Sequence, residues 1–391
     1  MLHFDDTEAA FEYQSKKDLR KAYLLFSLLK YPILVQLGSF ITIAAFKLGL
    51  PVKGLVKSTI FQQFCGGESI KESESRINQL AKYRVGTILD YSVEGKENEG
   101  DFENTKEEIV KTIIKAAENN HIPFSVFKVT GLGPSSILKK VNKKEALSEE
   151  EKEVVSKIRH RVNHICNMAY QNNVSVFIDA EDSWFQDFID ELALDMIMKY
   201  NKKAPIVYNT IQLYRHDRLN YMIDLIDTCR KSDVYLGLKL VRGAYMEKER
   251  EQAEIQGYRD PIHATKEDTD KDYNLAIDHC LSNLDKLYLC AGTHNEFSSS
   301  YLAQKMSENG IKNSDPRICF AQLLGMSDHI SFNLSKNGYH TAKYVPYGPI
   351  KEVLPYLIRR AKENTSVAGQ TGRELSLIKK EIKRRKSGNI S

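Results

Sequence analysis

The chain has 391 residues, of which 42% are apolar and 28% are charged. This length is enough for one large core, or for a large domain with a smaller one. The formal net charge is only +4, and much of the excess lies in one basic run, Lys379–Lys386. The rest of the chain is close to neutral, which argues against nucleic-acid binding, and a solvated helix end is the simpler interpretation of the basic run.

The six cysteines are scattered and none forms a CxxC pair. This usage is typical of reduced thiols in a cytoplasmic protein. The acidic N-terminus resembles neither a secretory nor an organellar leader. His160 and His164 have i, i+4 spacing, but no third ligand is near them in the sequence, so we predict no metal site.

Residues 1–84 are predicted to form an N-terminal helical region. Within it, Ile33–Leu50 is strongly apolar but is interrupted by polar residues that include Gln36 and Lys47. A membrane-spanning helix needs about 20 mostly apolar residues. We therefore expect a helix that is buried or that contacts a membrane surface, at the inner face of a membrane, in preference to a spanning one.

From residue 85 onward, apolar runs of strand length alternate with helical patterns. The eight predicted strands are Val85–Tyr91, Phe124–Thr130, Val174–Ala180, Pro205–Ile211, Tyr235–Gly243, Lys286–Gly292, Arg317–Leu323 and Thr341–Tyr347. The helices between and after them are Thr105–Asn120, Glu150–Asn172, Trp184–Lys199, Arg218–Arg230, Asp270–Leu284, Phe297–Asn309, Ser327–Leu334 and Lys351–Asn364.

Strand-then-helix units repeated in this way predict a parallel sheet of the α/β class. Eight such units indicate a closed (βα)8 barrel over residues 85–365. An open doubly wound sheet is the alternative, but no GxGxxG follows any strand. A loop at Thr365–Gly372 and a basic helix or tail over residues 366–391 complete the prediction.

Polar side chains lie where the predicted strands end, which is where barrels of this kind place their active sites. They are Lys128, Asp179, Glu181, Thr210, Gln212, Lys239, Arg242, Thr293, His294, Asn295, Gln322 and Tyr344. After the last strand, Tyr356, Arg359, Arg360 and Glu363 share one helix face. Each of these residues alone has an ordinary structural explanation. A lysine inside an apolar strand is costly to bury without a partner, however, and the joint placement favours a site.

The charges indicate two ligands. Lys128 with Arg359 and Arg360 suits a small carboxylate, because guanidinium groups bind carboxylates through two parallel contacts. Lys239, Arg242 and Lys266 suit a larger anion, such as a dinucleotide pyrophosphate. The residues alone therefore predict a barrel enzyme for a small acid with a phosphate-bearing cofactor.

Several stretches also resemble a known family. They are Lys239–Arg250 with its Arg-Gly-Ala-Tyr, Ile178–Glu181, Thr293–Asn295, Gln322–Met326, Tyr344–Pro349 and Tyr356–Asn364. In this order and with these gaps they are similar to proline dehydrogenases, from about residue 66 to the C-terminus. The likeness is greatest to the monofunctional, eukaryote-like branch.

The resemblance implies a distorted (βα)8 barrel that holds FAD. Its reaction is the oxidation of L-proline to Δ1-pyrroline-5-carboxylate in proline catabolism, with electrons passed to a quinone. The resemblance also implies roles for matched residues. Lys128, Arg359 and Arg360 would bind the carboxylate; Tyr344, Tyr356 and Tyr245 would pack on the ring; Asp179 would belong to the catalytic network; and Lys239 would lie near the reactive flavin nitrogen. The implied FAD contacts are Ala180, Gln212, Arg242, Gly243, Ala244, Lys266, Thr293, His294 and Asn295.

One departure from the family pattern and two alternatives stay open at this point. Many bacterial relatives have arginine where this chain has Lys239, so the charge is kept and the planar fork is lost. Tyr344 should crowd a hydroxylated ring, which favours proline over 4-hydroxyproline, although a 4-hydroxyproline dehydrogenase is one alternative. A non-catalytic barrel that senses proline is the other. The apolar N-terminal helix could bring the enzyme to the membrane that holds the quinone.

Overall fold

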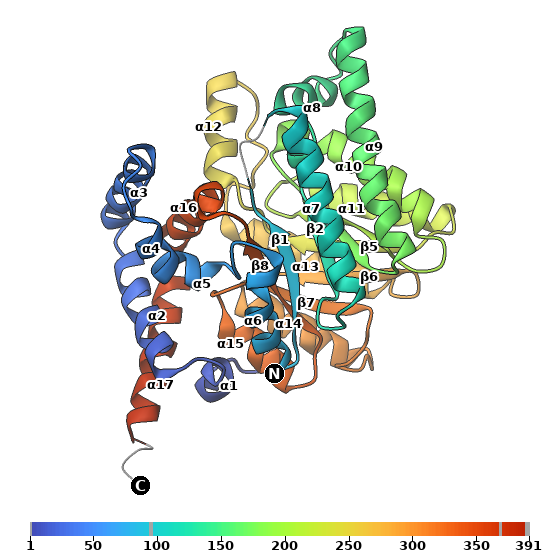
Figure 1. Ribbon diagram of the computed structural model, residues 1–391. Coiled ribbons are helices and arrows are strands. Elements are labelled where there is room, and N and C mark those ends of the chain that lie inside the picture. Colours follow the sequence, from blue (N-terminus) through green and yellow to red (C-terminus); the bar gives the residue numbers. More distant parts are fainter. Residues whose placement is uncertain (1, 94–96, 367–369, 388–391) are drawn as a thin grey trace. The chain divides into compact units, whose positions relative to one another are not determined.

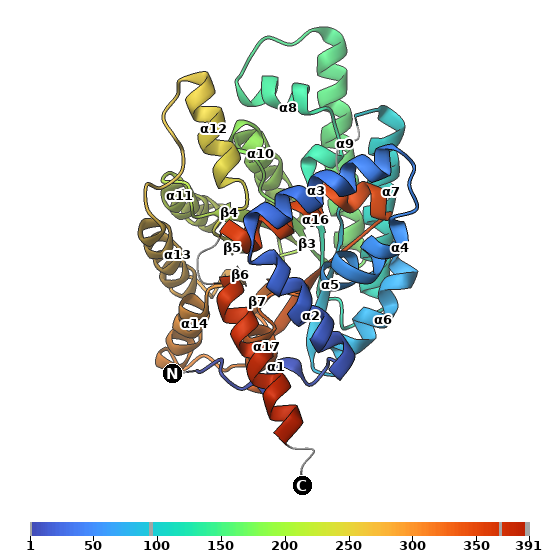
Figure 2. The same cartoon turned by 90° about the vertical axis from the view of Figure 1, so that its left-hand side faces the viewer.

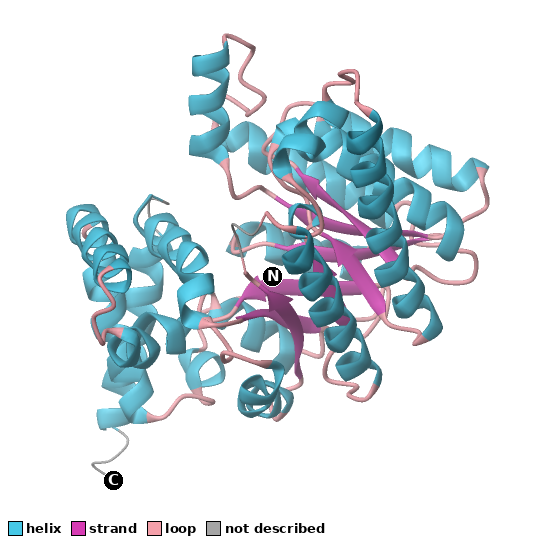
Figure 3. Cartoon of the chain, turned by 45° about the horizontal axis from the view of Figure 1, so that its top comes forward, coloured by secondary structure: helices cyan, strands magenta, loops and turns pink. Residues whose placement is uncertain are grey.

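The computed structural model describes residues 2–93, 97–366 and 370–387, without the side chains of residues 364–366, 370 and 371. Its eight parallel strands form one closed barrel in the order β1 to β8, drawn in magenta in Figure 3. The strands are β1 (Val85–Tyr91), β2 (Phe124–Phe127), β3 (Ser175–Ile178), β4 (Val207–Gln212), β5 (Leu236–Val241), β6 (Leu287–Gly292), β7 (Ile318–Leu323) and β8 (Thr341–Tyr347). The predicted (βα)8 barrel and its eight strands are confirmed.

The chain divides into two compact units, residues 95–321 and residues 2–94 with 322–391, and each is described by itself. The predicted domain boundaries at residues 84 and 365 are drawn from the pattern of strands and helices in the sequence. The two compact units do not test these boundaries, which stay a prediction.

The first unit carries β2 to β6 with their helices. The helices are α7 (Glu99–Ala117), α8 (Ser135–Asn142), α9 (Glu149–Gln171), α10 (Ser183–Tyr200), α11 (Arg218–Lys231), α12 (Met246–Gln256), α13 (Lys266–Leu281) and α14 (Glu296–Glu308) (Figure 1). Its interior is aromatic: Phe124 stacks on Phe177, and both meet the ring of Tyr208 edge-on. A side chain at Gly237 would overlap the Tyr208 ring, so glycine keeps this layer closed.

In the second unit β8 pairs with β1 in parallel. Its helices are α1 (Thr7–Phe11), α2 (Lys16–Leu29), α3 (Pro32–Lys47), α4 (Lys53–Val56), α5 (Gln62–Phe64), α6 (Ile70–Ala81), α15 (Asp328–Lys336), α16 (Ile350–Ser366) and α17 (Gln370–Ser387), with a π-helical turn at Lys57–Phe61. Figure 2 shows α17 along α2 and α3 across α16. One apolar cluster joins residues from both chain ends, including Phe26, Phe64, Leu357 and Ile378.

Two predictions for the C-terminal part need correction. Helix α16 extends to Ser366 and α17 begins at Gln370, so most of the predicted loop Thr365–Gly372 is helical, and residues 367–369 lie outside the described residues. The basic run is also not simply a solvated helix end, because Arg385 donates to the carbonyl oxygens of Phe11 and Gln14. A helix whose Leu377 and Ile378 are buried is packed against the unit.

Helix α3 buries only Val35 and Ala45 and leaves most of its apolar side chains exposed. Among the described helices, none alone is long and apolar enough to cross a bilayer. Helices α2 and α3 meet that test only as a pair, and the pair is bent by 103°.

Candidate functional site

The centre of the candidate site is an ion-pair triad in which the buried Asp179, just after β3, meets the buried Lys239 of β5 and the half-buried Lys128, just after β2. Lys128 Nζ donates to Asp179 Oδ2 at 3.0 Å, and Lys239 Nζ forms an ion pair with Asp179 Oδ1. The Lys239 side chain is 5% exposed. Burial pushes the pKa of Asp179 upward, but Lys239 and Lys128 outweigh burial, and the net pKa is lowered. The carboxylate therefore stays ionised and holds both cations at the barrel mouth.

Two further side chains of β4 extend this triad. Thr210 pairs in register with Lys239, so both side chains point to the same face of the sheet. Among the described residues, the buried Thr210 hydroxyl has no hydrogen-bond partner. Gln212 Nε2 donates to the carbonyl of Glu181 at 2.6 Å. A buried polar atom without a partner is costly, so Thr210 marks a place where a ligand would complete the bonding.

Glu181 is a member of the site to which the sequence assigned no role. Its carboxylate accepts from the backbone N–H of Thr130 at 3.0 Å and from the Thr130 hydroxyl. Burial raises the pKa of Glu181 to about 7, against the opposing effect of the Thr130 donors. In the sequence, the feature that could have indicated Glu181 is its position at a strand end, two residues after Asp179. In the structure, its raised pKa supports a place in the site, because shifted pKa values gather at functional sites.

A second cluster lies where β5 and β6 end. Arg242 donates from Nε to Asp270 at 2.7 Å, from Nη1 to the Thr293 hydroxyl at 2.7 Å and from Nη2 to the Ser298 hydroxyl at 2.9 Å. Lys266 pairs with the other oxygen of Asp270. The structure thus brings Arg242, Lys266 and Thr293 together around Asp270, and their role in binding a cofactor stays a prediction. Asp270 offsets part of their charge.

The remaining predicted cofactor residues of this unit lie at turns. Asn295 caps α14 by accepting from the Ser298 N–H at 3.0 Å, and His294 beside it is half-buried. Gly243 has a φ of +140°, and a side chain there would come within 2.5 Å of the Tyr214 ring. Only glycine fits this turn. Gly243 and Ala244 are exposed there, and Tyr245 beside them is half-buried. Ala180 is half-buried in the loop after β3.

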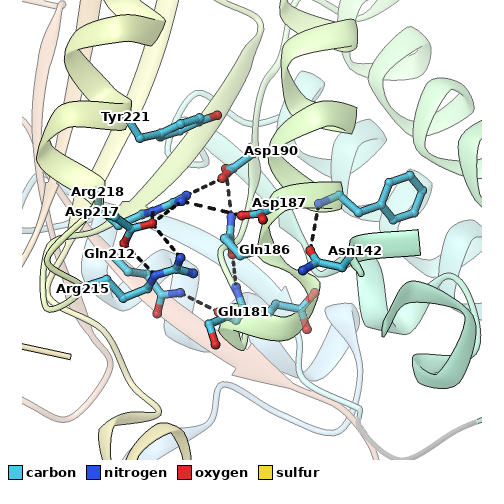
Figure 4. Close-up of polar contacts among 12 residues, drawn as sticks. Asn142, Glu181, Gln186, Asp187, Asp190, Gln212, Arg215, Asp217, Arg218 and Tyr221 are labelled. Atoms are coloured by element: carbon cyan, nitrogen blue, oxygen red, sulfur yellow. Dashed lines mark hydrogen bonds and ion pairs between the residues drawn. The ribbon is translucent and has the colours of Figure 1, made fainter. Parts of the chain in front are cut away.

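A buried network behind the triad was missed by the sequence reasoning (Figure 4). The Glu181 N–H donates to Gln186 Oε1 at 2.8 Å, and Gln186 Nε2 donates to Asp190 Oδ1 at 2.9 Å. Asp190 also pairs with the buried Arg218. Burial raises the pKa of Asp190, although Arg218 counteracts this. Gln186 and Asp190 lie on α10 and Arg218 on α11, and nothing in a single sequence distinguishes these three from solvated helix positions.

The other predicted substrate residues belong to the second unit. Tyr344 is buried on β8, and Tyr356, Arg359 and Arg360 are on α16. The Arg360 guanidinium lies 5.3 Å from the centre of the Tyr356 ring and pairs with Glu363. Within the described parts of the chain, the buried Tyr356 hydroxyl has no hydrogen-bond partner. The predicted clamp combines Lys128 of one unit with Arg359 and Arg360 of the other, so it stays a prediction.

The family model described as "Proline dehydrogenase" matches residues 73–373. This chain belongs to the proline dehydrogenase family. Family membership makes it an oxidoreductase that acts on proline, and the family is flavin-dependent in general.

Proteins similar to this proline dehydrogenase family member include a proline dehydrogenase, a hydroxyproline dehydrogenase and a solved structure of proline utilization A. "Proline dehydrogenase 1, mitochondrial" of Dictyostelium discoideum is 35% identical over 87% of this chain and 67% of its own length. "Hydroxyproline dehydrogenase" of Xenopus laevis is 30% identical over 98% of this chain and 90% of its own length. A crystal structure of proline utilization A from Bdellovibrio bacteriovorus has a TM-score of 0.71 at 19% identity. It covers 93% of this chain, which spans only 38% of that protein, and supports the fold alone.

Proposed function

We propose that this chain oxidises L-proline to Δ1-pyrroline-5-carboxylate with FAD as its cofactor, in proline catabolism. The observation that carries the proposal is the ion-pair triad of Asp179 with Lys128 and Lys239, in a chain of this family. FAD would supply the hydride acceptor, and the protein would supply position and electrostatics.

The residues present fit such a cofactor. Among the residues that the structure describes, the Thr210 hydroxyl has no hydrogen-bond partner, and Thr210 lies beside Lys239, so a polar edge of a flavin ring could complete its bonding. The positive charge of Lys239 would stabilise negative charge that develops nearby. Arg242, Lys266 and the polar turn Thr293–Asn295 would bind the nucleotide part, for which the exposed backbone of Gly243 and Ala244 leaves room.

For the substrate, we assign carboxylate binding to Lys128, Arg359 and Arg360. Guanidinium forks hold a carboxylate with defined geometry, and holding the ring at the right distance supplies much of a rate enhancement. Tyr245, Tyr344 and Tyr356 would pack on the ring. Asp179 would keep Lys128 and Lys239 in place and balance their charge between turnovers.

The first experiment is an absorbance spectrum before and after L-proline is added without oxygen. The purified protein should be yellow, and proline should bleach it. Protein that carries FAD and is not reduced by proline would contradict the proposal and favour the proline-sensing barrel.

In the same assay, Arg359→Met should raise the KM for proline sharply while FAD stays bound. The control is Lys351→Met, an exposed residue of the same helix. Equal KM values for the two variants would contradict the assignment of Arg359 to carboxylate binding.

A 4-hydroxyproline dehydrogenase remains the second candidate because the Xenopus relative carries that name. Tyr344 is a bulky ring on β8, and we expect it to disfavour a hydroxylated substrate. The kcat/KM for L-proline should therefore exceed that for 4-hydroxyproline. The reverse order would establish the alternative.

We further propose that the electron acceptor is a quinone and that α3 contacts the membrane that holds it. Residues 19–67 contain six basic residues and no acidic one. The apolar side chains most exposed along α3 and beside it include Ile33, Phe40 and Leu48, with exposures of 78%, 71% and 75%. Patches of this kind on a protein surface indicate an interaction site, and lysines at their edges suit anionic lipid. No acidic residue in this stretch would oppose such a contact.

Vesicle co-sedimentation tests this contact. The protein should bind vesicles with anionic lipid and bind neutral vesicles weakly, and Ile33→Glu with Phe40→Glu should abolish binding. Phe297→Glu is the matched control, because Phe297 is an exposed apolar residue of the other unit. Binding that survives the double change, or that the control abolishes equally, would count against α3.

A further inference from the structure

Helix α12 is attached to the protein in an unusual way. It directly follows the turn Arg242–Tyr245, and it buries only Glu249 and Ala253. Met246 and Ile255 are largely exposed, so no apolar stripe holds the helix down. Its most buried side chain is a carboxylate, Glu249, at 0% exposure. Most helices are held by an apolar face, so polar contacts must hold α12.

Those contacts reach the first turn of α10. Glu249 accepts from the backbone N–H of Ser183 at 2.6 Å with one oxygen, and from the Ser183 hydroxyl at 2.6 Å with the other. Ser183 is the first residue of α10, so the negative charge lies at a helix N-terminus, where it is favourable. Lys248 adds an ion pair of 2.7 Å to Asp182.

The short loop between β3 and α10 begins at Asp179 and ends at Asp182, next to Ser183. Two members of this loop are held by neighbouring strands: Asp179 by Lys239 of β5 and by Lys128 after β2, and Glu181 by Thr130 after β2 and by Gln212 of β4. The contacts from α12 fix the far end of the same loop. The turn that leads into α12 and the loop that carries Asp179 are therefore joined through Glu249.

We propose that Glu249 is a positioning residue: it fixes α12 to the start of α10 and thereby holds the loop of Asp179 in the arrangement that the reaction requires. This inference rests on the proposed function. The Glu-Lys-Glu-Arg run after Arg-Gly-Ala-Tyr thus gains a specific role, in which the buried Glu249 binds Ser183 and the exposed Lys248 pairs with Asp182.

The test variant is Glu249→Gln, which keeps the shape and removes one acceptor and the charge. Flavin reduction by L-proline should slow about 10- to 100-fold, the cost expected when a catalytic group is slightly misplaced. FAD content and the thermal midpoint should stay close to those of the parent. Glu251→Gln, an exposed position on the same helix, is the control and should change neither rate nor stability.

Limited trypsin digestion gives a readout that needs no catalysis. Lys248 and Arg250 are exposed on α12, and cleavage after them should accelerate in Glu249→Gln and not in Glu251→Gln. Unchanged cleavage together with an unchanged rate of flavin reduction would overturn the inference. The proposed function fails separately, if proline does not reduce the flavin of the unmodified protein.

Ser183→Ala extends the test if Glu249→Gln does not fold. It removes only the hydroxyl contact, so flavin reduction should slow less than in Glu249→Gln. If Glu249→Gln does fold, the two losses should overlap in the double variant, because both changes remove the same contact. A Ser183→Ala variant with a normal rate and normal trypsin cleavage, or fully additive losses in the double variant, would contradict the role of Glu249.

Discussion

At the scale of single residues, Asp179 is the group on which the candidate site depends. It forms ion pairs with both Lys128 and Lys239, and Lys239 is almost fully buried. Asp179→Asn should therefore leave two cations without their partner, and breaking a buried pair from one side costs roughly 3–5 kcal/mol. We expect a clearly lower midpoint in urea unfolding together with much slower flavin reduction. A variant as stable as the parent would show that the triad is not a strong electrostatic unit.

The pKa of Asp179 also determines how its contribution to stability changes with pH. Its pKa in the folded protein is lowered below the ordinary value of 3.8. The stability that it contributes is therefore fully present above that value and is lost as pH falls through the folded pKa. Glu181 behaves in the opposite way, because its pKa in the folded protein is raised to about 7 from 4.5. Its contribution is fully present below 4.5 and is lost as pH rises through about 7.

Glu181→Gln tests that second direction. Glutamine stays neutral, so the variant should gain stability relative to the parent between pH 4.5 and about 7 and keep a constant difference above that range. The measurement is the free energy of unfolding in urea at pH 5, 6, 7 and 8 for both proteins. A difference that does not change between pH 5 and pH 8 would mean that Glu181 titrates as an ordinary surface carboxylate.

At the scale of elements, the turn at Gly243 connects β5 to α12. Gly243→Ala must adopt a conformation that costs about 1–3 kcal/mol, and its new side chain would overlap the Tyr214 ring. We expect a lower thermal midpoint and poor retention of FAD. Gly257→Ala is the matched control at the other end of α12, because it also has a positive φ but has nothing within 4 Å. It should lose some stability and keep its flavin.

The strands were predictable because each is buried on both faces and reads as an apolar run. Lys239 was predictable for the same reason, since a charge inside such a run needs a partner. Helix α12 was missed, because its sequence lacks the apolar stripe that marks a helix. Strand β2 ends three residues before its predicted end, because Lys128 leads into a short 3-10 turn at Val129–Gly131. The Arg218–Asp190–Gln186 network depends on which helix faces meet, which no local pattern reveals.

At the scale of the whole molecule, the two chain ends belong to one compact unit, although nearly the full sequence separates them. Arg373 pairs with Asp5, and Lys380 donates to the carbonyl of Asp5. Contacts of such long sequence separation leave no trace in periodicity or composition, so the basic run was expected to be solvated. In the structure, Lys380 and Arg385 of this run donate to backbone carbonyls of the N-terminal segment.

Arg385 should therefore matter more for stability than its neighbour Arg384. Arg385 donates to the carbonyls of Phe11 and Gln14 and pairs with the buried Glu381, whereas Arg384 pairs with Glu381 from a more exposed position. Hydrogen bonds to charged groups contribute about 1.5–3 kcal/mol, and surface ion pairs about 0–1 kcal/mol. Arg385→Met should thus lower the free energy of unfolding in urea by more than Arg384→Met does. Equal losses would mean that α17 is held only by its apolar side chains, such as Leu377 and Ile378.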